Sequence, residues 1–235
     1  MTGRAGVDQL AQQFRLLADS IADSKDTRAA TQRLTTLAAR TIDGCDWAGL
    51  TRHTRRQGIP TTAVSSPTTL QVDQLQYELH EGPCVDAVTT NGLFHAPDLR
   101  ADTRWPRFSS RTVADTPVRS VVSVTLSPAP PRTALNLYAH RADAFGPNDI
   151  ELTAAFAVHA AVALGYIQAI DKTVNLEHAL TTSRLIGTAM GILMYKHRIT
   201  ADEAFDRLTG ISQRHNRKLV VVADHVTRTG ELPSW

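Results

Sequence analysis

GTAMGILMYKHRITADEAF, from Gly187 to Phe205, is the stretch from which the fold of the C-terminal part can be worked out. Its first eight residues carry no charge and a basic patch follows at once, so it could be a membrane segment, a buried helix or a binding surface. The apolar run around it, Leu185–Tyr195, is bracketed by Arg184 and Lys196. We find no uncharged apolar run close to the ~18 residues that span a bilayer. A membrane segment is therefore not expected.

The end of this stretch and the residues after it predict two further helices. Thr200 and Glu203 have the spacing of a capping box, in which each side chain accepts a hydrogen bond from the other residue's backbone amide. The inner face of this helix is formed by Ala204, Phe205, Leu208 and Ile211. We predict that Asn216 caps the last helix and that Gly230 ends it. Three short helical units of this kind make a small bundle.

A long helix is predicted upstream of the bundle, beginning near Asn148. One seam along it alternates steps of three and four residues, as in a coiled coil. Its members are Leu152, Ala155, His159, Val162, Tyr166, Ala169, Thr173, Leu176, Leu180, Ser183, Gly187, Met190 and Met194. The helix is either continuous or broken near residues 171–175. It either pairs with a second copy of the chain or packs on its own sheet, and both alternatives stay open.

The N-terminal two thirds mix strands and helices without the regular alternation of a parallel sheet. Val118–Leu126 is rich in β-branched residues and predicts a central strand, with Leu135–Ala139 as its hairpin partner. Further strands are expected at 47–53, in 58–66 and at 93–96, and helices at 8–21, 26–42, 70–79, after 81–84 and at 104–114. An antiparallel sheet with helices on its faces fits this order. The fold class is therefore α+β.

Composition limits the function classes. Apolar residues make up 42% and charged residues 20% of the chain, which fits a packed protein with a net charge of only +2. Residues 171–235 contain nine basic and seven acidic side chains and four histidines, so affinity for an anionic partner is expected there. Cys45 and Cys84 follow no secretory signal, and we expect free thiols in a reducing cytoplasm. No metal-ligand spacing and no glycine-rich phosphate loop occurs, so neither a metal nor a cofactor is expected.

Ser183–Pro233 closely resembles an ANTAR domain. The resemblance rests on Arg184 and Ile186, the A-x-G-x-L-M run, the T-x-x-E-A-F box, the N-R-K-L run and the closing T-G-E-L-P. The sequence from about 26 to 168 resembles the GAF domain that often precedes ANTAR in actinobacterial regulators. Its motifs are LQYEL-x-EGPC, DLR…RWPRF, RSVVSVTL and LNLYA. The expected organisation is an N-terminal helix (1–25), a GAF-like sensor (26–168), a helical linker (169–182) and an ANTAR three-helix bundle (183–235).

This resemblance implies a transcription antitermination regulator. ANTAR domains bind paired RNA hairpins in leader transcripts, usually as dimers, and GAF domains bind small molecules or pair with each other. The implied partners are RNA hairpins, a second copy of the chain and an unidentified small-molecule effector, without a membrane and without enzymatic activity. One alternative is a dimeric small-molecule sensor that acts by protein contact without RNA.

The candidate RNA-binding residues combine cations, an amide and one aromatic ring, which suit phosphates and splayed bases. They are Arg184, Tyr195, Lys196, Arg198, Arg214, Asn216, Arg217 and Lys218. Met190 stands where the family commonly has lysine, which predicts weaker or altered RNA binding. The spacing of Gly187 and Gly191 places both on one helix face, where we favour close packing within the bundle over approach by an outside partner.

Cys84 is a candidate redox thiol if the helix after Pro83 lowers its pKa. His80 and His95 are near it in sequence, which raises a third alternative, a Cys84-dependent enzyme, although no oxyanion device can be named. Trp105, with Arg104 and Arg107, is expected to fix a loop onto the sheet domain.

Overall fold

The computed structural model describes residues 15, 26–53, 61–127, 129 and 132–233. It divides into two compact units, Met1–Ala169 and Ile170–Trp235. The helix predicted at 8–21 lies outside the described residues, apart from Arg15.

The first unit is built on a five-stranded antiparallel sheet in the order β2-β1-β5-β4-β3. Its strands are β1 (Trp47–His53), β2 (Thr61–Val64), β3 (Leu93–Ala96), β4 (Ser120–Ser127) and β5 (Arg132–Ala139). The predicted hairpin of β4 and β5 is confirmed, with Val122 opposite Leu137. Nearly every residue of β4 and β5 is buried, because neighbouring side chains point to opposite faces of the sheet and both faces are covered.

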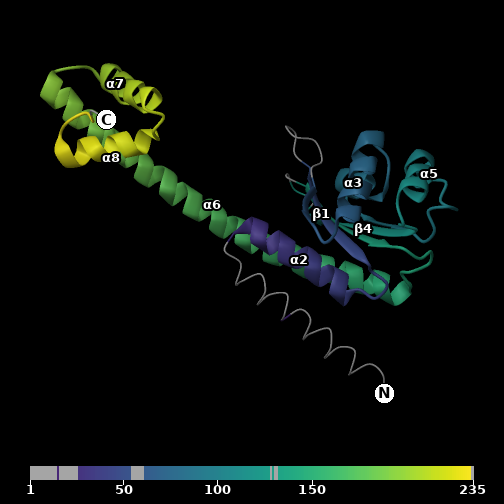
Figure 1. The fold of residues 1–235 in the computed structure, drawn as a ribbon. Coiled ribbons are helices and arrows are strands. Elements are labelled where there is room, and N and C mark those ends of the chain that lie inside the picture. The colour runs from purple at the N-terminus through teal and green to yellow at the C-terminus, as the bar shows by residue number, and fades with distance from the viewer. Residues whose placement is uncertain (1–14, 16–25, 54–60, 128, 130–131, 234–235) are drawn as a thin grey trace. The chain divides into compact units, whose positions relative to one another are not determined.

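Helices cover both faces of this sheet, as Figure 1 shows. On one face lie α2 (Thr27–Thr41) and the first part of α6 (Pro147–His197), and on the other α3 (Pro67–Leu79), α4 (Pro83–Thr90) and α5 (Pro106–Asp115). The α2 side is apolar: Leu34, Leu50 and Leu135 are buried there. The α3 side mixes apolar side chains such as Phe108 with buried polar ones.

Helix α6 is continuous over its 51 residues, so no break occurs at 171–175. Our expectation about apolar runs was wrong, because Leu152–Ile170 carries no Asp, Glu, Lys or Arg. Among the described residues, α6 has the length and composition of a membrane span, with a mean hydropathy of 1.6 over 18 residues. Yet Phe156, Ala160 and Leu164 pack into the core of the sheet. Core packing accounts for the buried third of this stretch, 33% of that window.

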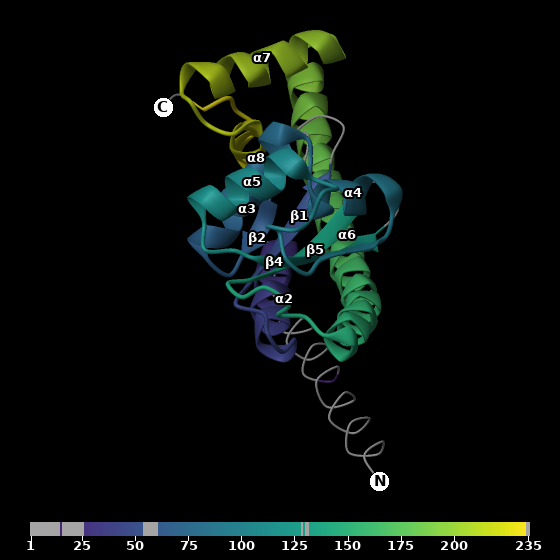
Figure 2. The same cartoon turned by 90° about the vertical axis from the view of Figure 1, so that its right-hand side faces the viewer.

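The second unit is a small helical bundle formed by the C-terminal part of α6 with α7 (Ala201–Arg214) and α8 (Leu219–Thr229), visible in Figure 2. The capping box at Thr200 and Glu203 is present, and Gly230 ends α8 in the left-handed conformation, as predicted. The fully buried core consists of Ala189, Leu193, Ala204, Leu208, Val222, Ala223 and Val226.

Candidate functional sites

The corner between α7 and α8 carries most of the candidate RNA-binding residues. Arg214, Asn216, Arg217 and Lys218 are all exposed. Their loop is closed by a backbone hydrogen bond of 2.9 Å from the Arg217 amide to the Ser212 carbonyl. The corner therefore presents cationic and amide groups on a connection with a defined backbone path.

The prediction that Asn216 caps the last helix is wrong. Asn216 adopts the left-handed conformation, with φ of 48°, and the N-cap position belongs to Lys218, which makes no side-chain capping bond. Asparagine tolerates this conformation better than most residues because its short side chain bonds locally. Asn216 therefore turns the chain, and its amide lies outside the first turn of α8.

The exposed side of α6 in the second unit carries Arg184, Gly187, Gly191 and Tyr195. Their spacings of three, seven and eleven residues place them on one helix face. Tyr195 is 91% exposed. A Cβ atom added at either glycine would meet nothing within 4 Å. Our expectation that these glycines admit neighbouring helices of the bundle is therefore wrong, because this face of α6 is open.

Lys196 and Arg198 differ in their surroundings. The Lys196 ammonium donates to the Gly230 carbonyl and pairs with the Glu231 carboxylate, so it joins the end of α6 to the end of α8. Arg198 is exposed and sits in the left-handed conformation after α6, with φ of 53°. Met190 is half-buried against the bundle core, which explains why an apolar side chain suits this position.

In the first unit, two of the GAF-like motifs, LQYEL-x-EGPC and DLR…RWPRF, contact each other. Glu81 accepts hydrogen bonds from the backbone amides of Arg107 and Phe108, at 2.7 and 3.0 Å. Trp105 is buried and its indole donates to Asp86 at 2.9 Å, while the Arg104 guanidinium lies 4.2 Å from its ring centroid. The expectation that Trp105 fixes a loop onto the sheet domain agrees with these contacts.

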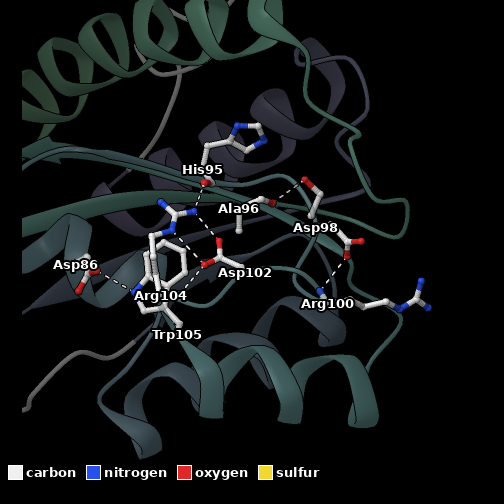
Figure 3. Close-up of polar contacts among 9 residues, drawn as sticks. Asp86, His95, Ala96, Asp98, Arg100, Asp102, Arg104 and Trp105 are labelled. Atoms are coloured by element: carbon white, nitrogen blue, oxygen red, sulfur yellow. Dashed lines mark hydrogen bonds and ion pairs between the residues drawn. The ribbon is translucent and has the colours of Figure 1, made fainter.

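Figure 3 shows the rest of this loop. The Arg104 guanidinium donates to both carboxylate oxygens of Asp102 and to the His95 carbonyl at the end of β3. Asp98 accepts from the Arg100 amide at 2.9 Å. The contacts of Arg104 and Asp102 therefore hold the loop against the end of β3.

A buried polar network lies between the sheet and α3, and sequence reasoning missed it. Asp73 is fully buried and accepts hydrogen bonds from Thr61, Asn136 and Tyr138. Gln76 donates to Tyr138 at 3.0 Å. Burial raises the pKa of Asp73 from 3.8 to about 6. The available signal was the three-residue spacing of Asp73 and Gln76, which puts both polar residues on one face of the helix predicted at 70–79.

The environment of Cys84 does not favour a thiolate. The side chain is fully buried, and burial and the nearby Asp73 raise the pKa of its thiol to about 12, against hydrogen bonds that include one from Asn136. A reactive thiol needs the opposite, a lowered pKa and solvent access. Cys45 is half-buried, and burial likewise raises its pKa to about 12. These surroundings argue against a redox role for Cys84.

Comparison with known proteins agrees with this architecture. The GAF domain family model matches residues 24–165 and the ANTAR domain model matches residues 174–226. Among curated proteins, none matches the sequence significantly.

Several solved structures share the fold of the first unit. The GAF domain of a phosphoenolpyruvate-protein phosphotransferase from Coxiella burnetii is 12% identical, with a TM-score of 0.54 over 68% of this chain and 95% of that one. A free methionine-R-sulfoxide reductase from Neisseria meningitidis, solved with its substrate, is 13% identical, with a TM-score of 0.50 over 68% and 91%.

The photosensory core module of a Stigmatella aurantiaca phytochrome is 10% identical, with a TM-score of 0.62 over 90% of this chain and 46% of that one. At such identities the likeness concerns the fold alone. The domain matches carry the assignment: this chain belongs to the GAF domain family and joins its GAF domain to a C-terminal ANTAR domain, the order found in GAF-ANTAR regulators.

Proposed function

We propose that this protein is a cytoplasmic transcription antitermination regulator that binds paired hairpins in leader RNA through its ANTAR domain, under control of its GAF domain. The observation that carries the proposal is the ANTAR match over residues 174–226, together with the cationic corner that lies within it. The mechanism involves no covalent chemistry. The protein would act by binding a leader-RNA hairpin that lies just before a terminator, and this binding would prevent termination.

Two surfaces of the ANTAR unit support RNA contact. The corner of Arg214, Arg217 and Lys218 offers cations that suit phosphates. The open face of α6 offers Tyr195 as a stacking surface, and Gly187 and Gly191 leave its backbone accessible. Lys196 contributes less, because its ammonium already contacts Gly230 and Glu231.

The proposed active form is a homodimer that pairs through α6, with residues 169–182 as the linker. Four large apolar side chains on the predicted seam are more than half exposed: Val162, Tyr166, Leu176 and Leu180. A second copy of the helix would bury them. Pairing would also link two ANTAR units, so that two weak hairpin contacts become one strong one through effective concentration.

The test is a titration of the full chain with a tandem-hairpin RNA, a single hairpin and an unpaired strand of equal length. We expect the tandem hairpin to bind best. A triple variant, Arg214→Glu, Arg217→Glu and Lys218→Glu, should lose at least roughly tenfold in affinity, because charged hydrogen bonds contribute about 1.5–3 kcal/mol each. Its salt dependence should flatten by about 0.7–0.9 in log–log slope for each phosphate contact removed.

The matched control is Arg111→Glu, which reverses an exposed arginine on α5 in the GAF domain. It should leave affinity unchanged. Equal binding by wild type and the triple variant would reject the site assignment. Absence of any RNA binding by the wild type would reject the proposed function and favour the alternative, a dimeric sensor that acts by protein contact through its exposed apolar seam.

A further inference from the structure

The carboxyl group of Asp73 lies inside the GAF domain without a cation. Its side chain is fully buried, and none of the ion pairs among the described residues involves it. Its partners are neutral: the Thr61 hydroxyl at 2.8 Å, the Asn136 amide at 3.1 Å and the Tyr138 hydroxyl. A buried carboxylate that lacks a positive partner is strongly disfavoured relative to its protonated form.

The other titratable groups around Asp73 are all acids. Tyr77 lies on α3 itself, Cys84 comes from α4 and Tyr138 from β5, while β1 and β2 contribute the hydroxyls of Thr51 and Thr61. Burial raises the pKa of the Cys84 thiol to about 12 and also raises the pKa of both tyrosines. These three groups therefore stay neutral near pH 7, and Asp73 alone changes charge there.

A chain of hydroxyls allows the network to accept either charge state. Thr61 contacts Tyr77 at 2.9 Å, Tyr77 contacts Thr51 at 2.7 Å, and in each pair either oxygen can donate. When Asp73 is ionised, Thr61 donates to it and the other two hydroxyls donate toward Thr61. When Asp73 is protonated, it donates to Thr61 and the chain runs the other way. All the bonds survive protonation, but only ionisation leaves a buried charge.

We propose that Asp73 is a proton-sensitive switch of the GAF domain: its protonation fastens α3 to strands β1, β2 and β5, and its ionisation loosens α3 and the edge strand β2. The elements that it joins are far apart in sequence, since Thr61, Asp73 and Asn136 come from an edge strand, a helix and a central strand. This proposal goes beyond RNA binding and does not depend on it, because it concerns the signal that the domain receives.

The direction of the effect follows from linkage. The pKa of Asp73 is raised by burial from 3.8 to about 6, so its contribution to stability is fully present below pH 3.8. That contribution is lost as the pH rises through about 6. A difference of two pKa units corresponds to a change of about 100-fold in the local opening equilibrium.

The experiment is amide hydrogen exchange on the full chain from pH 5 to pH 8, corrected for intrinsic exchange and read in peptides covering residues 61–79. In the wild type we expect protection to fall with rising pH by up to about tenfold, which is the part of the 100-fold change that remains above pH 5. In Asp73→Asn, whose amide can donate to Thr61 as the protonated acid does, protection should stay high and independent of pH. Asp115→Asn, which removes an exposed carboxylate on α5, should behave like the wild type.

A wild type without this pH dependence, or an Asp73→Asn variant that keeps it, would overturn the proposal. A second measurement needs no variant: the Asp73 carboxyl carbon, followed by NMR in the wild type, should titrate well above pH 3.8. A midpoint at or below the ordinary value would also overturn it. Neither readout involves RNA, so failure of the switch and failure of the proposed function are separate results.

Discussion

Replacing Glu81 tests most directly the contact between the LQYEL-x-EGPC and DLR…RWPRF motifs of the GAF domain. One carboxylate oxygen accepts from the backbone amides of Arg107 and Phe108, and the other accepts from the Arg107 guanidinium at 3.0 Å. These amides lie in the first turn of α5, whose N-cap residue, Trp105, makes no side-chain capping bond. Glu81 therefore caps the N-terminus of α5 from a distant position in the sequence.

We expect Glu81→Ala to destabilise the GAF domain by about 2 kcal/mol. Losing a capping side chain costs typically ~1 and up to about 2 kcal/mol. The exposed pair with Arg107 adds less than about 1 kcal/mol, because solvent screens it. Glu81→Gln keeps an oxygen that can accept from the two amides and loses only the charge. It should therefore destabilise the domain about half as much as Glu81→Ala.

Urea unfolding at pH 7, followed by the fluorescence of buried Trp105, measures this difference. Burial opposes ionisation of Glu81, but hydrogen bonds from Phe108 and Arg107 outweigh it and lower its pKa below 4.5. The advantage of wild type over Glu81→Ala should therefore be full above pH 4.5 and shrink as the pH falls through the lowered pKa. A cost below about 0.5 kcal/mol at pH 7, or a Gln variant as unstable as Ala, would refute the capping role.

Two further predictions come with internal controls. Gly82→Ala should cost about 3 kcal/mol or more in urea unfolding, because φ is 138° and the new Cβ would lie 2.4 Å from the buried Gln76 amide oxygen. Gly191→Ala on the open face of α6 should instead stabilise the ANTAR unit by up to about 1 kcal/mol. If both alanine variants lost the same unfolding free energy, this reasoning would be contradicted. Leu193→Ala should destabilise the bundle by about 3 kcal/mol, since Leu193 is fully buried. Met194→Ala, at a residue 36% exposed, should cost far less in the same thermal melt.

The elements of the fold could be predicted where a local pattern decides them. Strand β4 follows from the β-branched run at 118–126, and its antiparallel partner from the turn-rich break after it. The capping box at Thr200 and the stop at Gly230 depend on groups within four residues, so one sequence suffices to find them. Such signals are local because helix ends and strand periods are local.

Predictions failed where contacts outside the recognised pattern decide the outcome. Asn216 has the side chain of an N-cap, but the bond from the Arg217 amide to Ser212 turns the chain before α8 begins. Gly187 and Gly191 have the spacing of a helix contact, but the helices of the bundle pack on the other side of α6. The candidate RNA-binding residues were selected by family motif and residue type, which cannot tell that Lys196 is engaged by Glu231.

In the interior of the GAF domain, several polar residues serve the fold in one fixed state, and Asp73 differs from them. Gln76, Glu81 and Gly82, all from the LQYEL-x-EGPC motif, are each committed to a contact that positions a neighbouring element. Asp73 is different, because its ionised form has no cation and weakens the fold near pH 7. Asparagine there would be more stable near pH 7, because it keeps hydrogen-bonding groups for Thr61, Asn136 and Tyr138 without a charge. Groups that oppose stability are expected at functional positions. Under the proposed switch, a carboxyl group that changes charge near pH 6 would give the core two states.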